Sequence, residues 1–404
     1  MGRSWSGMVR DSGLVLGLDI GSSQIDAVIA DVGNANEIIV RGVGRSMSNG
    51  LDKGRIVSQS ELVASIDRAL KRAEREIGVR PQNVVITVPH YHMHFGYSSG
   101  LSIPRVDSSI TEDDKTAAIL KSKKMIKATD QLILHAFPVE YLVDGRSVDD
   151  PLGKAGPSLE VTTHFVLANS SNMNALLQVT QALHLHVAGM VYAPIAAAQM
   201  FLSPIERREG CILIDIGAKS TSVSLFKRDL LQSTFLIPVG GDMITADLVQ
   251  CLSVTAPEAE RVKVKYGSVD LEQVEYRDKF EISSLDRGRV EIKRQYMCKI
   301  IHARVEELFR IIARRAQIGP EFPYDIVVSG GTSQLEGLGG VASRILGHPV
   351  RVGPPGKDPA HLTHRHYGTA LGLVSYGLKT GAIVPYETPP GFLERLNRKL
   401  SRWF

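Results

Sequence analysis

The sequence predicts an α/β protein made of two related halves, and three glycine-rich turns carry this prediction. The turns follow apolar strands that begin at Val15, Cys211 and Asp325. The first two repeat one pattern, in which Asp-Ile-Gly ends the strand and small residues follow, and their aspartates, Asp19 and Asp215, lie 196 positions apart. Small residues let backbone N–H groups approach an anion, whereas a strand aspartate is costly unless it faces a cation or donors. We therefore expect a duplicated fold with two phosphate-binding turns facing one cleft.

Length and composition limit the class of protein. A chain of 404 residues allows two to three domains, and 43% hydrophobic with 22% charged residues is ordinary for a soluble globular protein. The net charge of +4 is small for this length and gives no reason to expect nucleic acid, which needs a concentrated basic face. No apolar run is long enough to span a membrane as a helix. The polar residues 1–12 indicate a flexible leader, although 1–6 also fit a loose myristoylation pattern.

Cysteines and histidines give no clear metal or redox motif. The three cysteines are far apart in apolar or helical stretches, so we expect buried, reduced thiols. Three histidines alternate along the chain and would share one face of a strand. They are either metal ligands or part of an exposed polar face, and no carboxylate or cysteine nearby completes a metal set. The residues are Cys211, Cys251 and Cys298, and His90, His92 and His94.

Periodicity predicts the other elements of the first half. Ser60 is a suitable N-cap for one helix, and Gly78 follows its end. From about Pro89 to about Leu159, prolines, glycines and acids interrupt short apolar runs, which indicates an inserted subdomain. Small residues around Ala196 favour a hinge or a tight helix contact. The expected strands are 25–30, 38–43, 84–88 and 161–168, and the expected helices are 60–77, 111–129 and 172–184.

In the second half, Gly240 and Gly241 open a helix that is a reasonable nucleotide-facing element. The next helix carries Glu260 and Lys263 one turn apart, either as nucleotide contacts or as a surface ion pair. A long helix over 289–316 has Ile292 and Tyr296 among its buried residues and a basic outer face. The expected strands are 223–226, 233–239 and 350–352, and the other expected helices are 241–252, 256–266, 338–346 and a small-residue helix from 367 that partners the one at Ala196.

The segment 391–404 carries a separate signal after a linker over 379–390. On a helical wheel its apolar residues fall within an arc of about 120°. Four basic residues lie outside or at the edge of this arc, which is the composition of a helix that lies on an anionic membrane surface. The alternative is that this helix packs against its own domain rather than on a membrane. The apolar residues are Phe392, Leu393, Leu396, Leu400, Trp403 and Phe404, and the basic ones are Arg395, Arg398, Lys399 and Arg402.

Together these motifs resemble the actin, sugar-kinase and heat-shock chaperone superfamily, and within it the FtsA family of bacterial cell-division proteins. Residues 133–145 and 151–156 match the family's signature in an inserted subdomain called 1C, and Pro238 to Gly241 with Thr245 matches its turn into subdomain 2B. The resemblance covers nearly the whole chain and implies an actin-like, two-lobed ATPase fold with a C-terminal amphipathic helix. The implied ranges are 1–12 for the leader, 13–83 for the first part of subdomain 1A, 84–163 for 1C, 164–204 for the second part of 1A, 205–240 for the first part of 2A, 241–304 for 2B, 305–362 for the second part of 2A, 363–378 for the return to 1A, 379–390 for the linker and 391–404 for the membrane-targeting helix.

The resemblance also implies a scaffold. Members of the family bind ATP with Mg²⁺, polymerise into filaments and hold the FtsZ ring on the cytoplasmic face of the cell membrane at the division septum. They grip the C-terminal peptide of FtsZ on subdomain 2B and recruit downstream division proteins. Asp19 and Asp215 would organise Mg²⁺ through water. The implied nucleotide residues are Asp19, Gly21, Ser22, Ser23, Gln24, Asp215, Gly217, Lys219, Ser220, Thr221, Gly241, Glu260, Lys263, Gly330, Gly331 and Gln334, and the peptide residues are Arg304 by position and Lys293, Arg294 and Lys299 by charge.

One turn departs from the family's usual Asp-Ile-Gly-Gly-Gly-Thr followed by an acid. Ala218 and Lys219 replace two glycines, and Ser222 stands where the acid is expected. Lys219 would then supply charge to a phosphate, while hydrolysis is expected to be weak at most. A kinase or ATPase of the same superfamily is one alternative, but no further carboxylate base stands out. An actin-like adaptor of a pilus or secretion machine is another, which should lack the 1C signature.

Overall fold

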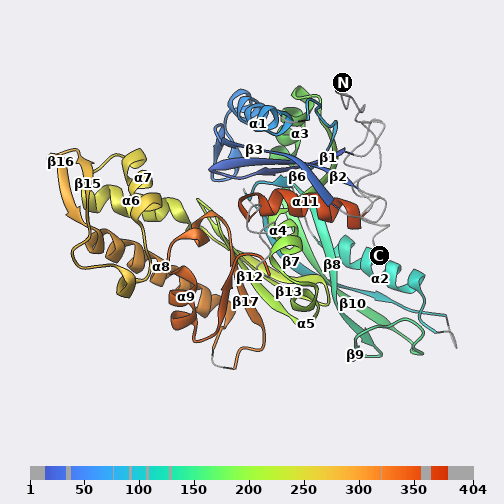
Figure 1. Cartoon of the computed structure of the whole chain (residues 1–404). Helices are drawn as coiled ribbons and strands as arrows, with labels where there is room; N and C mark the ends of the chain where they lie inside the picture. The colour runs from blue at the N-terminus through green and yellow to red at the C-terminus, as the bar shows by residue number, and fades with distance from the viewer. Residues whose placement is uncertain are drawn as a thin grey trace, which may run out of the picture. The chain divides into compact units, whose positions relative to one another are not determined.

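A computed structural model of the chain forms two compact units, one of residues 1–199 with 367–404 and one of residues 200–366 (Figure 1). The leader, most of the linker and the amphipathic segment lie outside the described residues. The structure describes residues 14–32, 38–75, 77–90, 93–105, 109–126, 130–319, 321–355 and 365–380.

The first unit is built on a five-stranded sheet with the order β3-β2-β1-β6-β11. The central strand β1 runs antiparallel to β2 and parallel to β6. Gly17 of β1 lies so close to α11 that a Cβ atom would meet the carbonyl oxygen of Ala370 at 2.1 Å. The bounds are β1 Leu14–Ile20, β2 Gln24–Val32, β3 Ile38–Met47, β6 Asn83–Val88, β11 His186–Tyr192 and α11 Gly368–Lys379, with a small hairpin of β4 Leu51–Asp52 and β5 Arg55–Ile56.

Helices complete this unit. α1 begins after Ser58, whose side chain accepts a hydrogen bond from Glu61 N, so the predicted cap at Ser60 is two residues late. The predicted pairing of two small-residue helices is confirmed, because a Cβ atom on Gly372 would meet the Ala196 carbonyl oxygen at 2.0 Å. The bounds are α1 Gln59–Glu74, α3 Ser170–Ala182 and α4 Ala193–Phe201.

The insert is a four-stranded sheet, β7-β10-β8-β9, packed against α2. The central sheet includes β6, so residues 84–88 belong to that sheet rather than to the insert, as the parallel pairing with β1 requires. His94 begins β7 while His90 precedes it, so the alternating histidines do not share one strand. The described residues contain no group of three or more His, Cys, Asp or Glu that could hold a metal. The bounds are β7 His94–Ser102, α2 Glu112–Met125, β8 Gln131–Val143, β9 Arg146–Val148 and β10 Leu159–Asn169.

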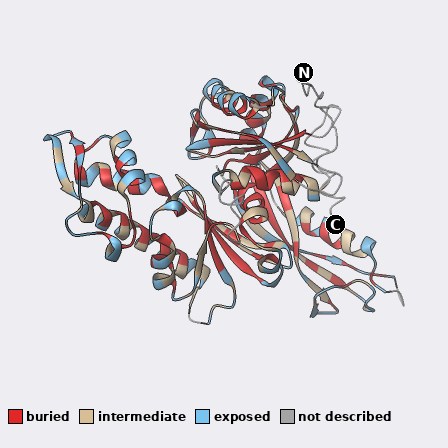
Figure 2. Cartoon of the chain, viewed as in Figure 1, coloured by how far each residue is buried: buried red, intermediate tan, exposed pale blue. Residues whose placement is uncertain are grey.

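The second unit contains a sheet of the same design, with the order β14-β13-β12-β17-β18. Its central strand β12 runs antiparallel to β13 and parallel to β17, which confirms the duplication that the repeated turns predict. Both central strands are almost wholly buried (Figure 2). The bounds are β12 Cys211–Ile216, β13 Thr221–Lys227, β14 Leu230–Ile237, β17 Asp325–Ser329, β18 Val350–Val352, α5 Pro204–Glu209 and α9 Leu338–Leu346.

A mostly helical part of this unit lies between β14 and β17 in the chain. The predicted long helix starts too early: residues Gly288–Lys293 form strand β16, and α8 follows at once. No side chain caps this helix start, so the sequence carries no start signal there. Tyr296 is 51% exposed rather than buried, and Cys251 is exposed, unlike the other two thiols. The bounds are α6 Gly241–Leu252, α7 Ala256–Tyr266, β15 Lys279–Ser284 and α8 Arg294–Ala316.

Candidate nucleotide and peptide sites

The first phosphate-type turn joins β1 to β2 and is closed by a bond from Gly21 N to Gln24 O of 3.1 Å. The Asp19 carboxylate at the end of β1 accepts a hydrogen bond of 2.9 Å from Thr87 Oγ1, and Thr87 in turn accepts one from Ile20 N. Thr87 is the penultimate residue of the parallel neighbour β6, so the sheet itself positions this donor. The predicted residues Gly21 to Gln24 are therefore brought together in one short turn with Asp19 beside them.

The second turn repeats this geometry in the other unit. Gly217 N donates to Ser220 O at 3.0 Å, and Ser329 Oγ from the parallel strand β17 donates to Asp215 Oδ1 at 3.0 Å. Burial raises the pKa of the Asp215 carboxyl, and the Ser329 hydrogen bond opposes this only in part. A carboxylate held at the end of a strand with its charge poorly solvated is suited to a hydrated cation.

A backbone group of α6 and a side chain of the third glycine element close around the second turn. Gly217 O accepts bonds from Gly241 N at 3.0 Å and from Thr332 Oγ1 at 3.1 Å. Gly330 has φ +89°, and a Cβ atom there would meet the Ile216 carbonyl oxygen at 2.4 Å, so glycine is required. At Gly331 a Cβ atom would meet nothing within 4 Å, so there is open space beside this residue.

Charged side chains also gather at the start of α6. Burial raises the pKa of Asp242, while the charges of Lys219 and Lys263 lower it and that of Glu260 raises it. The predicted residue Lys219 therefore brings positive charge to the same small region as the N-terminus of a helix of 12 residues. Both features favour an anion.

Lys263 and Glu260 are more than a solvated surface pair. Lys263 is only 7% exposed, and its Nζ lies 2.6 Å from Glu260 Oε2. Nζ also donates to Gly241 O at 3.1 Å and to Thr245 Oγ1 at 2.8 Å, which fixes α7 against the glycine turn. Gln334, also predicted, lies within 3.0 Å of His366 Nδ1. All the second-half nucleotide residues thus lie on connected elements of one unit.

Sequence reasoning missed the hydroxyl groups that orient the two aspartates. Thr87 and Ser329 lie near or at the ends of the strands parallel to β1 and β12, and both are 1% exposed. The signal available was a small hydroxyl residue at the end of an apolar strand, which is too common to select without the sheet order. Ser222 is also buried, and its Oγ has no hydrogen-bond partner among the described residues.

The predicted peptide residues differ in how far their own chain already binds them. Arg304 on α8 donates to both carboxylate oxygens of Asp247 on α6, at 2.7 and 2.9 Å. Lys299 is exposed on the same helix. Lys293 is the last residue of β16 rather than a helical residue, and its Nζ lies 3.1 Å from Tyr276 Oη.

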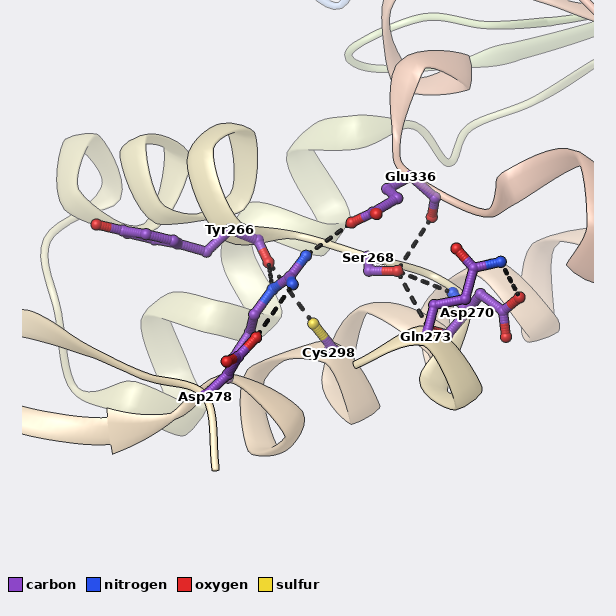
Figure 3. Close-up of polar contacts among 8 residues, drawn as sticks. Tyr266, Ser268, Asp270, Gln273, Asp278, Cys298 and Glu336 are labelled. Atoms are coloured by element: carbon purple, nitrogen blue, oxygen red, sulfur yellow. Dashed lines mark hydrogen bonds and ion pairs between the residues drawn. The ribbon is translucent and has the colours of Figure 1, made fainter. Parts of the chain in front are cut away.

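Arg294 has the most intramolecular partners of the four. Figure 3 shows these partners, Tyr266, Asp278 and Glu336, together with Ser268. Arg294 donates to Tyr266 O at 2.8 Å and to Glu336 at 2.7 Å, and it lies 3.5 Å from Asp278. Glu336 O also accepts a bond from Ser268 Oγ at 3.3 Å. Arg294 therefore connects the end of α7 to the segment that follows the third glycine element. This role is structural within the unit and leaves the guanidinium little capacity for a ligand.

The membrane residues predicted at 391–404 lie outside the described part of the chain. Within the described residues, no helix is both long and apolar enough to cross a bilayer.

Two family models match the chain. The model of "Cell division protein FtsA" matches residues 212–372, and that of "SHS2 domain inserted in FTSA" matches residues 91–167. The FtsA protein of Pseudomonas aeruginosa is 29% identical over 380 residues, which cover 92% of this chain and 91% of the relative. That of Bacillus subtilis is 28% identical over 384 residues, with 93% and 86% covered.

Solved structures show the same fold at lower identity. A "PilM-PilN type IV pilus biogenesis complex" chain superposes with a TM-score of 0.66 at 18% identity and covers 92% of this chain and 99% of its own. MreB5 of Spiroplasma citri bound to ADP superposes with a TM-score of 0.54 at 13% identity, with 92% and 98% covered. These likenesses show an actin-like fold, and the second family model adds the inserted domain.

Proposed function

Because the chain belongs to the FtsA family of cell division proteins, we propose that it is an ATP-binding, actin-like adaptor that tethers the FtsZ ring to the cytoplasmic membrane. The observation that carries this proposal is the combination of the family's inserted domain with two complete phosphate-type turns. The same role includes self-assembly into filaments and recruitment of downstream division proteins at the septum. It places the protein peripherally on the cytoplasmic face of the membrane.

For the nucleotide, Asp19 and Asp215 would hold Mg²⁺ through water, and the two turns would hold the phosphates. The described residues fit such a ligand, because an oriented carboxylate, a small-residue turn and a helix N-terminus occur together in the second unit. Bound Mg²⁺ would neutralise phosphate charge. We expect hydrolysis to be weak at most, because Ser222 supplies no carboxylate beside Asp215.

For the peptide, α8 offers Arg304 and Lys299 on the surface of the second unit. An acidic C-terminal peptide of FtsZ would be attracted to these side chains, and Arg is suited to carboxylates because its fork binds both oxygens. Arg294 contributes less, because it joins α7 to the segment after the third glycine element through Tyr266 O and Glu336. Lys293 contributes less, because it lies on β16 rather than on α8.

Fluorescence anisotropy of a labelled FtsZ C-terminal peptide, titrated with the full chain, tests this function. We expect saturable binding in the micromolar range, typical of a transient peptide contact. Arg304→Glu should abolish peptide binding while fluorescent ATP analogues still bind. Absence of peptide binding by folded, ATP-loaded protein would contradict the proposal.

The segment 391–404 would anchor the adaptor through its apolar arc and basic flank. Truncation after Pro390 should therefore release the protein from anionic liposomes in a sedimentation assay. If the truncated chain sediments as well as the full chain does, another part of the protein holds the membrane.

A further inference from the structure

The guanidinium of Arg304 is already occupied by two carboxylates of its own chain. Nε and Nη2 donate to Asp247 at 2.7 and 2.9 Å, and Nη1 donates to Glu307 one turn further along α8. All three nitrogens therefore have a partner. One positive charge faces two negative ones, so the group presents a net negative charge to an approaching acidic peptide.

This cluster lies at the surface of the second unit. The side chains of Arg304 and Asp247 are 22% and 24% exposed, and that of Glu307 is 57% exposed. A carboxylate from solution can reach such a pair, and the exchange of one carboxylate for another keeps the guanidinium paired throughout. The bidentate geometry with Asp247 is also the geometry that a peptide carboxylate would use.

We propose that Asp247 is an internal competitor for the peptide, and that peptide binding proceeds by exchange of the Asp247 carboxylate for a peptide carboxylate on Arg304. Glu307 lowers the affinity further by repulsion. Together the two acids set how acidic a peptide must be to bind. This inference rests on the proposed function, because it takes Arg304 as the peptide-binding residue.

The exchange has a second consequence through α6. Asp247 lies on the helix that begins at the Gly240–Gly241 turn beside the second phosphate-type turn. Release of Asp247 removes an ion pair that joins α6 to α8. The internal competitor therefore connects the peptide-binding residue to an element of the nucleotide site within one unit.

The test measures anisotropy of the labelled FtsZ C-terminal peptide with full-length, ATP-loaded variants. Asp247→Asn should bind the peptide about three- to tenfold more tightly, and Glu307→Gln about twofold, as expected for ion pairs near the surface. Glu306→Gln is the matched control for Glu307→Gln: it makes the same charge change one residue away on α8, but Glu306 pairs with Arg310 at 2.7 Å rather than with Arg304. This control should change affinity less than Asp247→Asn or Glu307→Gln does.

The same variants are also titrated with a second peptide, in which Asp and Glu are replaced by Asn and Gln. This peptide is also made with an amidated C-terminus, so that it carries no carboxylate. Asp247→Asn should give no gain in its binding, because no carboxylate is exchanged. If Asp247→Asn and Glu307→Gln bind the acidic peptide no better than Glu306→Gln does, the competitor role is wrong, while loss of binding in Arg304→Glu would leave the proposed function standing. If Arg304→Glu binds as well as the unchanged chain, both are wrong.

Discussion

The two phosphate-type turns, one in each unit, share one design but differ in the residues that face their aspartates. In both, a central strand ends in Asp-Ile-Gly, and a hydroxyl from the parallel neighbour bonds the aspartate, at 2.9 Å in the first and 3.0 Å in the second. The closing bonds are 3.1 and 3.0 Å. The duplication has thus preserved the positions of the carboxylates and of the backbone N–H groups.

The difference lies on the next two strands. In the first unit, Asp19 is in register with Asp26, and Asp26 with Arg45, which donates to it at 2.6 and 2.8 Å. In the second unit the equivalent positions are Ser222 and Leu236. The acid and its arginine are therefore absent together, which indicates that a second carboxylate beside the strand aspartate needs its own cation.

The largest expected effect comes from breaking the acid–arginine pair. Arg45→Met leaves Asp26, 8% exposed, without its main partner and should lower the free energy of unfolding by about 3 kcal/mol in urea titrations. Leu236→Met, at the equivalent position, should cost less than about 1.5 kcal/mol. The double change Asp26→Ser with Arg45→Met gives a Ser–Met pair that is close to the Ser222–Leu236 pair of the second unit, and it should restore most of the loss. Equal losses for Arg45→Met and Leu236→Met would contradict the comparison.

The next effect comes from adding the acid where its arginine is absent. Ser222 is 2% exposed and directly opposite Asp215, so Ser222→Asp places two carboxylates side by side and should cost about 2 kcal/mol. Adding Leu236→Arg should recover at least half of this cost. Thermal denaturation of the single and double variants checks both statements. A double variant less stable than Ser222→Asp would show that the pair cannot be transferred.

Local sequence patterns predict part of the fold and of the candidate site, whereas contacts between distant strands cannot be predicted from them. The strand–Asp-Ile-Gly turns are local patterns, so the duplicated fold and the residues Asp19, Gly21, Asp215 and Gly217 could be predicted. The partners Thr87, Ser329 and Arg45 come from distant strands, and only the register of the sheet places them. The start of α8 was misplaced for a related reason, because β16 runs into the helix without a capping side chain.

A smaller effect concerns the charge of Asp215. Burial raises the pKa of this carboxyl, so its contribution to stability is full below the pKa of an unfolded aspartate, about 3.9, and is lost as pH rises through the folded value. Ionised Asp215 is therefore destabilising at pH 7 in the nucleotide-free protein. Asp215→Asn should stabilise it by about 1 kcal/mol at pH 7, and the gain should disappear in acid. Asp325→Asn, an exposed acid on β17, should give no such gain.

The smallest effect concerns Lys219, which stands in the second turn where the first has Ser23. Its charge lowers the pKa of Asp242, so the ammonium group already acts on the start of α6, where phosphate would be bound. Lys219→Ser should weaken binding of a fluorescent ATP analogue about threefold, and more strongly when Mg²⁺ is removed with EDTA, because Lys219 then supplies a larger share of the positive charge. Lys265→Ser removes the same charge from the exposed face of α7 and should leave affinity unchanged. If Lys219→Ser and Lys265→Ser weaken binding of the ATP analogue equally, the effect comes from the net charge of the protein. Lys219 then makes no specific contribution to nucleotide binding at the second turn.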